Sequence, residues 1–308
     1  MHRLMFATLL PALCVGFSLG EPQAVPEQRP TISVETNLVM LPVTVTDRHG
    51  QFVPGLDRDR FTVYDNDEVQ PIQFFSNEDM PTTVGLVIDC SGSMRARRAD
   101  VTAAGTAFAR SAHPLDELFT VNFNETVWPG LAPGVLFADT PDQLQRALAR
   151  APSAGMTALY DAIDRALDYL QRGSRDRRAL ILVSDGGDNA STTTLTSVID
   201  LSRRTNALIY AISIADESGH DGEPDVLRRL AHETGGAVFT PRNAAGVTEA
   251  FSLITADLRS GYMLGVSPPD ANGGFHTIRV VADPGDKRKL TARTRAGYYA
   301  AGHQHETR

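Results

Sequence analysis

The sequence predicts an α/β protein in which a doubly wound, mostly parallel sheet is inserted in a small antiparallel β-sandwich built from both chain ends. From Val84 to about Ser260, short apolar runs alternate with segments of helical periodicity. Residues 31–80 and 261–300 instead show short runs rich in Val, Thr and Phe between turn signals. Because a lone segment of this length rarely buries a core, we expect the two flanks to share one sandwich.

The flanking segments are expected to supply six strands. The leading flank holds three of them, at residues 38–47, 60–65 and 69–75. The trailing flank holds three more, at residues 261–267, 275–283 and 289–299, and a tail at 301–308 follows. Neither flank shows helical periodicity, so both are assigned to the sandwich.

The central segment, which we assign to residues 81–260, is expected to hold five buried strands with helices between them. The strands are expected at residues 84–89, 118–123, 179–184, 207–214 and 237–240. Apolar residues at helical spacing predict helices that follow Thr157 and that span 101–108, 225–234 and 247–258. Alternation of strands and helices over this length implies a parallel sheet covered on both faces.

Charge and hydropathy exclude two classes of function. The 308 residues include 29 basic and 37 acidic side chains, a formal charge of −8. Nonspecific nucleic-acid binding needs an excess of cations to neutralise phosphates, so nucleic acid is not an expected partner. Beyond the N-terminus no apolar run approaches the ~20 residues of a membrane-spanning helix, so no membrane span is expected after signal cleavage.

Residues 1–20 have the pattern of a secretory signal peptide: a basic residue, then an apolar stretch, then the small residues Ser18 and Gly20. We therefore expect cleavage after Gly20 and a secreted or periplasmic protein. Retention of the segment as a membrane anchor stays open. Residues 21–30 hold three prolines and little to bury, which predicts a linker.

Polar loops follow two of the predicted strands and open one of the predicted helices. Ligands of an open α/β sheet bind beyond the carboxyl ends of its strands, so we expect these loops to meet there. They carry two carboxylates and three hydroxyls: Asp89, Asp185, Ser91, Ser93 and Thr157. Taken singly, a hydroxyl of this kind can be a helix cap and an Asp-Gly pair can be only a turn. Together, an all-oxygen set suits a hard divalent cation, Mg²⁺ best.

These residues resemble the metal-ion-dependent adhesion site of von Willebrand factor A domains. Asp89, Ser91 and Ser93 match the pattern D-x-S-x-S, Thr157 lies in G-x-T-A-L-Y-D-A, and Asp185 lies in S-D-G. The flanks, with L-P-V-x-V-x-D early and R-x-G-Y-Y late, resemble von Willebrand factor A-related secreted proteins of Acidobacteria. The resemblance spans roughly residues 31–300 and implies a Rossmann-like domain within the sandwich.

The resemblance also implies roles for the five residues. Ser91, Ser93 and Thr157 would contact the metal directly, while Asp89 and Asp185 would act largely through water. Mn²⁺ or Ca²⁺ are possible in place of Mg²⁺. A cation that faces mostly neutral oxygens stays electrophilic and accepts a carboxylate from an Asp or Glu of a protein partner. The implied function is metal-dependent protein binding, with no catalysis.

Two other functions stay open. One is a metal-dependent hydrolase with Asp89 or Asp185 as general base, although no nucleophile–base pair or second metal cluster is apparent. The other is a structural envelope component without metal-dependent binding, against which the intact five-residue set argues. Asp188 is expected in the outer shell of the metal. The arginines at 95–98 have two interpretations: they either steer an acidic partner or form a solvated helix face.

Overall fold

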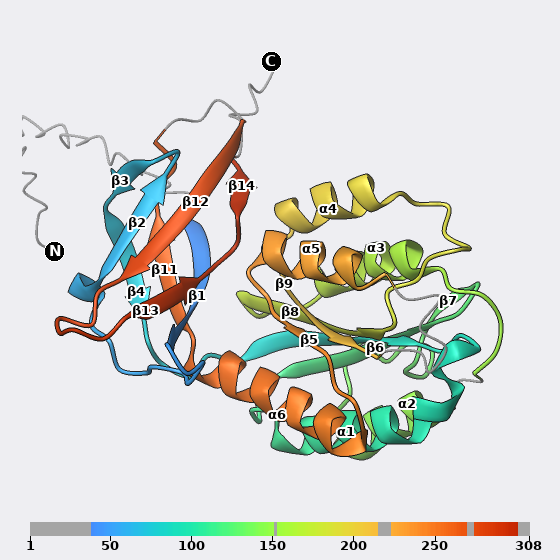
Figure 1. Ribbon diagram of the computed structural model, residues 1–308. Helices are drawn as coiled ribbons and strands as arrows, with labels where there is room; N and C mark the ends of the chain where they lie inside the picture. Colours follow the sequence, from blue (N-terminus) through green and yellow to red (C-terminus); the bar gives the residue numbers. More distant parts are fainter. Residues whose placement is uncertain (1–37, 151–152, 215–222, 270–273, 301–308) are drawn as a thin grey trace, which may run out of the picture. The chain divides into compact units, whose positions relative to one another are not determined.

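The computed structural model describes residues 38–150, 153–214, 223–269 and 274–300. The predictions for residues 1–20, 21–30 and 301–308 lie outside these residues. Within them, no helix is both long enough and apolar enough to cross a membrane. The described residues form one six-stranded sheet with helices and two four-stranded antiparallel sheets (Figure 1).

The six-stranded sheet has the order β10-β9-β8-β5-β6-β7. Five strands are parallel: β5 (Thr82–Asp89), β6 (Glu117–Phe123), β8 (Arg177–Ser184), β9 (Leu208–Ser213) and β10 (Val238–Phe239). Every residue of β5 is buried, as expected for a strand that helices cover on both faces. The edge strand β7 (Val127–Pro129) runs antiparallel and was not predicted, because three residues are too few for a periodic pattern.

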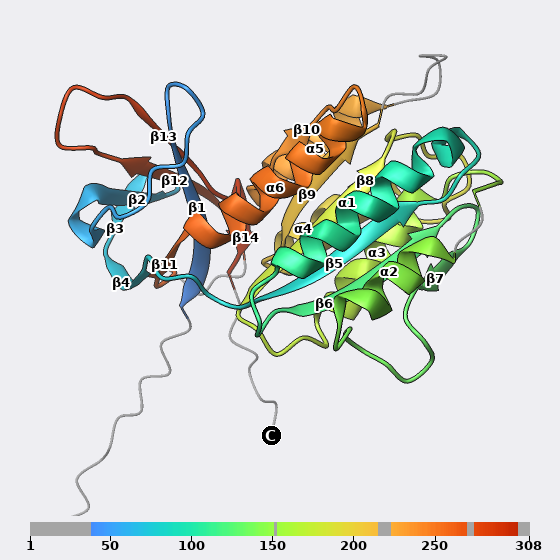
Figure 2. The ribbon, with the colours of Figure 1, turned by 90° about the horizontal axis from the view of Figure 1, so that it is seen from below.

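In the part of the chain that the structure describes, six α-helices cover the two faces of this sheet. On one face lie α1 (Arg98–Ser111), α2 (Pro141–Ala149) and α6 (Ala244–Ser260), which Figure 2 shows in front of the strands. On the other lie α3 (Leu159–Leu170), α4 (Leu195–Arg204) and α5 (Pro224–Thr234). The predicted stop of α5 is confirmed, since Gly235 ends it with φ 80°.

The two antiparallel sheets have the orders β13-β1-β11-β4 and β14-β12-β2-β3. Their strands are β1 (Val39–Asp47), β2 (Phe61–Asp65), β3 (Glu68–Gln70), β4 (Ile72–Ser76), β11 (Tyr262–Val266), β12 (Phe275–Ala282), β13 (Leu290–Arg293) and β14 (Gly297–Tyr299). Each sheet combines strands from both ends of the chain, since β1 pairs with β11 and β2 pairs with β12. The predicted fold class, with a sandwich built from both chain ends, is confirmed.

Two of the predicted strands are each divided between the sheets. The run at 69–75 becomes β3, which pairs with β2, and β4, which pairs with β11. Pro71 separates them because it has no N–H to donate to a ladder. The run at 289–299 likewise becomes β13, which pairs with β1, and β14, which pairs with β12. Strands that change sheet at a bend close the ends of a sandwich.

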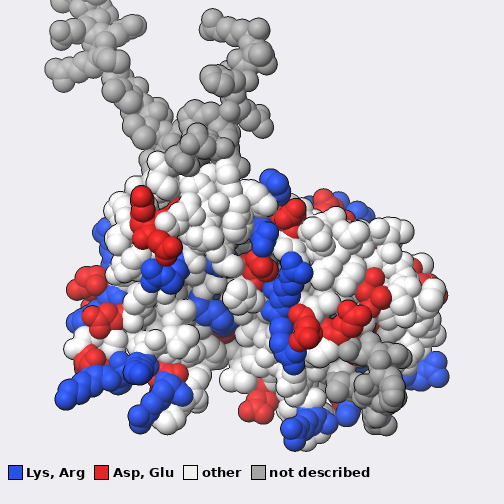
Figure 3. Space-filling view, turned by 45° about the horizontal axis from the view of Figure 1, so that its top comes forward, with Lys and Arg blue, Asp and Glu red and all other residues white. Residues whose placement is uncertain are grey.

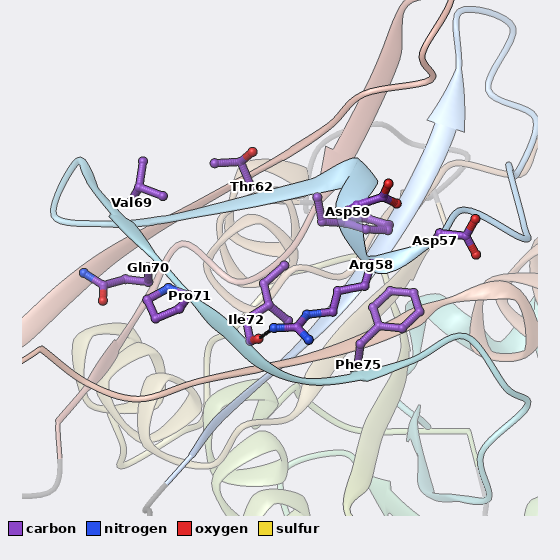
Figure 4. Close-up of a pocket in the computed structure, with 10 residues that line it drawn as sticks. Asp57, Arg58, Asp59, Thr62, Val69, Gln70, Pro71, Ile72 and Phe75 are labelled. Atoms are coloured by element: carbon purple, nitrogen blue, oxygen red, sulfur yellow. Dashed lines mark hydrogen bonds between the residues drawn. The ribbon is translucent and has the colours of Figure 1, made fainter.

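The break at Pro71 leaves an open groove of about 730 Å³ beside the edge strands β3 and β4 (Figure 4). Its apolar lining includes Phe61, Ile72 and Phe75, which belong to the sandwich core or pack against it. Arg58 is the first residue of a 3-10 turn (Arg58–Arg60) that follows Asp57, and its guanidinium donates to the Ile72 carbonyl. The groove therefore marks where the sandwich is open at one edge.

The polypeptide leaves the sandwich after β4 and returns to it through α6 and β11. These two strands are neighbours, with Ser76 opposite Met263. Buried Asp257 of α6 accepts hydrogen bonds from Thr44 of β1 and from Arg293 of β13. Ionic and hydroxyl contacts thus join the last helix of the α/β part to strands of both chain ends.

Candidate metal-ion site

The candidate site lies at the carboxyl end of β5, from which the central sheet grows in both directions. The parallel neighbours β6 and β8 flank β5, and the chain reaches them on opposite sides. A crevice at such a reversal of winding is where ligands of open α/β sheets bind. The loops that follow β5 and β8 both open at this edge.

Four of the five predicted residues form a continuous chain of contacts. The Asp89 carboxylate is fully buried and accepts hydrogen bonds from the Ser91 N–H at 2.8 Å and the Ser184 hydroxyl at 2.7 Å. The Ser91 and Ser93 hydroxyl oxygens are 3.1 Å apart. Ser93 in turn donates to Asp185 Oδ2 at 2.7 Å. The ends of β5 and β8 are therefore joined by side chains at the predicted positions.

The fifth residue, Thr157, lies in a loop that hydrogen bonds to both of the others. The Gly92 N–H donates to the Gly155 carbonyl at 3.2 Å, which ties this loop to the one after β5. The Thr157 N–H donates to Asn189 Oδ1 at 2.8 Å, and its carbonyl accepts from the Asn189 and Ala190 N–H groups. The backbone thus places Thr157, which is 6% exposed, between the two strand-end loops.

The electrostatics of the site are those of buried negative charge. Burial raises the pKa of the Asp89 carboxyl to about 6; hydrogen bonds from Ser91 and Ser184 lower it, and the nearby Asp185 carboxylate raises it. Both donors to Asp89 are neutral groups, so neither cancels its charge. A second carboxylate beside a buried first one favours a bound cation.

The residues present fit a hard cation. Among the described residues there is no group of three or more His, Cys, Asp or Glu side chains that could hold a metal. The donors at the site are instead hydroxyl oxygens backed by two carboxylates. Zinc sites in proteins are mostly built from sulfur and imidazole nitrogen, whereas Mg²⁺ takes oxygen ligands and keeps several waters.

Asp188 has a role that its sequence position did not reveal. Its Oδ1 accepts from the Leu159 N–H at 2.8 Å and from the Ser191 hydroxyl at 2.6 Å. Asp188 therefore caps α3 from a distant loop, satisfying N–H groups that have no partner inside the helix. These contacts place the Asp188 carboxylate against the N-terminus of α3, the helix that follows Thr157.

Two further residues support the site without having been singled out. Ser184 donates to Asp89 across 95 residues of sequence. Asp161, in the first turn of α3, accepts from the Thr192 N–H at 3.0 Å and the Thr193 N–H at 2.8 Å. Burial raises the pKa of Asp161, but these hydrogen bonds outweigh it and the pKa is lowered. No local spacing predicts such long-range partners.

The arginines at 95–98 do not act as a group. Arg98 is partly buried, with Nη1 2.8 Å from the sulfur of Cys90, and it also donates to the Leu148 carbonyl. Burial raises the pKa of the Cys90 thiol, although the nearby Arg98 charge lowers it. The exposed Arg95 donates to the Ser153 carbonyl at 3.2 Å, in the loop that leads to Thr157. Of this stretch, Arg95 is the residue that lies at the rim of the site.

Comparison with known proteins agrees with this geometry. A family model described as the von Willebrand factor type A domain matches residues 84–187, which include all five predicted residues. The search of curated protein sequences gave no significant match. The resemblance of the flanks to Acidobacteria proteins is not tested by these comparisons.

Two solved structures illustrate the likeness of fold. One is a von Willebrand factor type A protein from Catenulispora acidiphila, 16% identical, with a TM-score of 0.54 over 88% of this chain and 76% of that one. The other is proximal thread matrix protein 1 from the mussel byssus "with zinc occupied MIDAS motif", 14% identical, with a TM-score of 0.51. That match covers 63% of this chain and 49% of the mussel protein. Residues 84–187 thus match the family model of the von Willebrand factor type A domain, and the two solved structures share the fold of this chain.

Proposed function

We propose that this protein binds one divalent cation at Ser91, Ser93, Thr157, Asp89 and Asp185, and through it a carboxylate of a protein partner. The observation that carries the proposal is the contact chain Ser91–Ser93–Asp185 above the buried Asp89 charge. The cation supplies an electrophilic centre that accepts a carboxylate oxygen.

The chain's own residues orient the donors. Asp185 accepts a hydrogen bond from the Ser93 hydroxyl, which leaves the lone pairs of that hydroxyl directed away from the carboxylate. Asp89 holds the loop after β5 through the Ser91 N–H and adds a charge at the base of the site. Both carboxylates thus act behind the hydroxyls and leave the outer side of the site to the partner.

We propose Mg²⁺ as the resident cation, with Mn²⁺ or Ca²⁺ as substitutes. A set of hydroxyl and carboxylate oxygens supports this choice, because Mg²⁺ is bound by few charged ligands and retains waters that a partner can displace. The zinc that occupies the motif of the mussel protein is a property of that protein. A modestly charged cage predicts weak metal affinity in the absence of a partner.

The role we propose is binding and not catalysis, in the periplasm or outside the cell after removal of residues 1–20. The partner presents an Asp or Glu side chain to the metal. In this arrangement residues 81–260 carry the binding domain, and residues 31–80 and 261–300 form the sandwich that holds it. These boundaries are part of the proposal.

Calorimetry tests the metal site directly. Mg²⁺ is titrated into the wild type, into Asp89→Ala and into Asp164→Ala, whose carboxylate is exposed on the outer side of α3. We expect heat of binding in the wild type and the control variant and none in Asp89→Ala. Equal affinity in all three proteins would reject the site.

A pull-down from envelope extract tests the partner. Wild type and Asp89→Ala serve as bait, with Mg²⁺ or with a chelator. We expect a protein retained by the wild type with Mg²⁺ and released by the chelator. Retention that is indifferent to both the chelator and the substitution would point to the structural-component alternative.

A further inference from the structure

The sandwich carries a second charged feature, far in sequence from the metal site. We propose that the turn at 47–51 and the loop at 283–289 form a pocket, here called the basic pocket, that binds a phosphate-bearing ligand. Lys287 and Lys289, the only lysines of the sequence, both lie in this loop. In a chain with a formal charge of −8, such local accumulation of cations requires its own explanation.

The basic pocket is concave, with a volume of about 620 Å³. Four cationic side chains line it together with two carboxylates and His49. The cations are Arg48, Lys287, Arg288 and Lys289, and Lys and Arg side chains gather at the lower left of Figure 3. A fifth cation lies beside the loop, because a Cβ at Gly285, where φ is +71°, would overlap the Arg60 guanidinium.

Both carboxylates of the pocket are already engaged in shaping its turns. Asp47 Oδ1 accepts from the His49 N–H at 2.8 Å and the Gln51 N–H at 3.0 Å. Asp286 Oδ1 accepts from the Arg288 N–H at 2.8 Å, and its other oxygen is 2.8 Å from Arg288 Nε. Backbone hydrogen bonds, from Gln51 to Asp47 and from Arg288 to Asp286, lower the pKa of each carboxyl. Asp286 therefore neutralises Arg288.

Three cations of the pocket are not held in a close ion pair, although the Arg48 charge helps to lower the pKa of the neighbouring Asp47. Within the part of the chain that the structure describes, no ion pair joins Arg48, Lys287 or Lys289 to a carboxylate. Arg48 donates through Nε to His49 Nε2 at 3.0 Å. All three side chains are exposed, so an anion reaches them without rearrangement of the fold.

The chemistry of these groups favours phosphate. Lysine ammonium groups are compact point charges with three donors each, and a phosphate offers several oxygens and up to two charges. A concave pocket suits such a compact group. The turn and the loop lack large apolar side chains between Arg48 and Gln51 and between Pro284 and Lys289. Proteins that insert into a lipid surface use apolar side chains, so the pocket favours a discrete phosphate group over a membrane plane.

The probe for the first test is tripolyphosphate, titrated in calorimetry with EDTA present. EDTA removes divalent cations, so the outcome is independent of the proposed metal site. We expect binding that weakens at least tenfold in Lys287→Ala/Lys289→Ala and weakens again when the salt concentration rises. The matched control, Arg165→Ala/Arg172→Ala, removes two exposed positive charges from the region of α3 and should bind as the wild type does. Equal affinity in both double variants would overturn the proposal.

A second readout exploits the scarcity of lysine. Reductive methylation with ¹³C-formaldehyde labels only Lys287, Lys289 and the N-terminal amine, and it preserves their positive charge. We expect both dimethyl-lysine signals to shift during the titration with tripolyphosphate, while the N-terminal signal stays in place. Lysine signals that do not move would overturn the proposal even if calorimetry detects heat.

Vesicles distinguish the sources of the phosphate. Wild type is sedimented with phosphatidylglycerol vesicles and with phosphatidylcholine vesicles, again in EDTA. Binding to tripolyphosphate without sedimentation assigns a soluble phosphate ester, and binding to both assigns a lipid headgroup held in the same pocket. If the protein sediments with phosphatidylglycerol vesicles but does not bind tripolyphosphate, the proposal of a discrete phosphate site is wrong. The basic residues would then contact the charged membrane surface as a whole.

Discussion

Ser93 and Asp185 are 92 positions apart in the sequence, and the Ser93 hydroxyl donates a 2.7 Å hydrogen bond to the Asp185 carboxylate. This contact joins the loop after β5 to the loop after β8. The two residues have different roles in it, since the carboxylate accepts the hydrogen bond and the hydroxyl oxygen keeps its lone pairs free. A cation bound to Ser93, as proposed above, would meet a neutral oxygen with a negative charge behind it.

The effect of Asp89→Asn on the stability of the fold is expected to change sign when metal is added: the variant is the more stable protein without metal and the less stable one with it. At pH 8 without metal, the substitution removes a buried charge and stabilises the fold by on the order of 2 kcal/mol, because the raised pKa shows that burial disfavours the ionised carboxyl. With Mg²⁺ at about 100 times its dissociation constant, the wild type alone gains about 2.7 kcal/mol. Urea denaturation of the wild type and the variant, in EDTA and in Mg²⁺, measures both free-energy changes. A variant that is less stable than the wild type in EDTA would contradict this account.

Asp188→Ala is expected to lower the stability of the fold and to leave the affinity for metal largely unchanged. The substitution leaves the Leu159 N–H and the Ser191 hydroxyl without their acceptor, at a cost of about 1–2 kcal/mol. Asp164→Ala, on the exposed side of the same helix, is the control and should stay within about 0.5 kcal/mol of the wild type. Urea denaturation and Mg²⁺ titration are compared for both. If Asp188→Ala loses Mg²⁺ binding at unchanged stability, the carboxylate belongs to the metal's outer shell.

Asp161 is expected to make stability depend on pH in the acidic range. Its folded-state pKa lies below the unfolded value of 3.8, so its contribution is fully present above pH 3.8 and is lost as the pH falls through the folded-state pKa. Asp161→Asn should therefore cost about 1 kcal/mol between pH 7 and 5, and the difference from the wild type should shrink towards pH 3. Urea denaturation across this range measures the gap, and Asp164→Asn should show none. If the difference in stability between the wild type and Asp161→Asn grows as the pH falls, the prediction is wrong.

Removal of residues 261–300 is expected to unfold the leading strands. β1 and β4 both pair with β11, and β2 pairs with β12, so the truncation removes a ladder partner from each. Hydrogen exchange should show loss of protection at residues 39–76 and retained protection in β5 and β8 of the central sheet. Protected amides in the leading strands of the truncated protein would mean that the leading flank folds alone.

The central sheet and the candidate residues could be predicted because they depend on local patterns. Parallel strands covered on both faces appear as continuous apolar runs, as in Val84–Asp89 and Ala179–Ser184. Polar residues that follow such runs must meet at one edge of the sheet, so no long-range contact had to be known. The contacts of Asp89 with Ser91 and of Ser93 with Asp185 agree with that geometry.

The rest depends on contacts that leave no periodic trace. Ser184 and Asp188 act on residues 95 and 29 positions away, and a serine or aspartate in a loop looks the same with or without such a partner. The runs at 69–75 and 289–299 are each divided between two sheets. Only the first run has a sequence signal for the division, which is Pro71. Arg98 belongs to a helix start that looks solvated, yet its guanidinium reaches inward to Cys90.

The pairing of β1 with β11 determines how the sandwich responds to mechanical tension. Val39, at the start of β1, lies opposite Val266, while Val43 lies opposite Tyr262, where the chain arrives from α6. A pull between Val39 and the central α/β part therefore acts on opposite ends of two adjacent strands. Their hydrogen bonds are perpendicular to that force and must break together, in shear and not one after another. The insertion of the α/β part between β4 and β11 therefore lets the sandwich resist such a pull without peeling apart at β1.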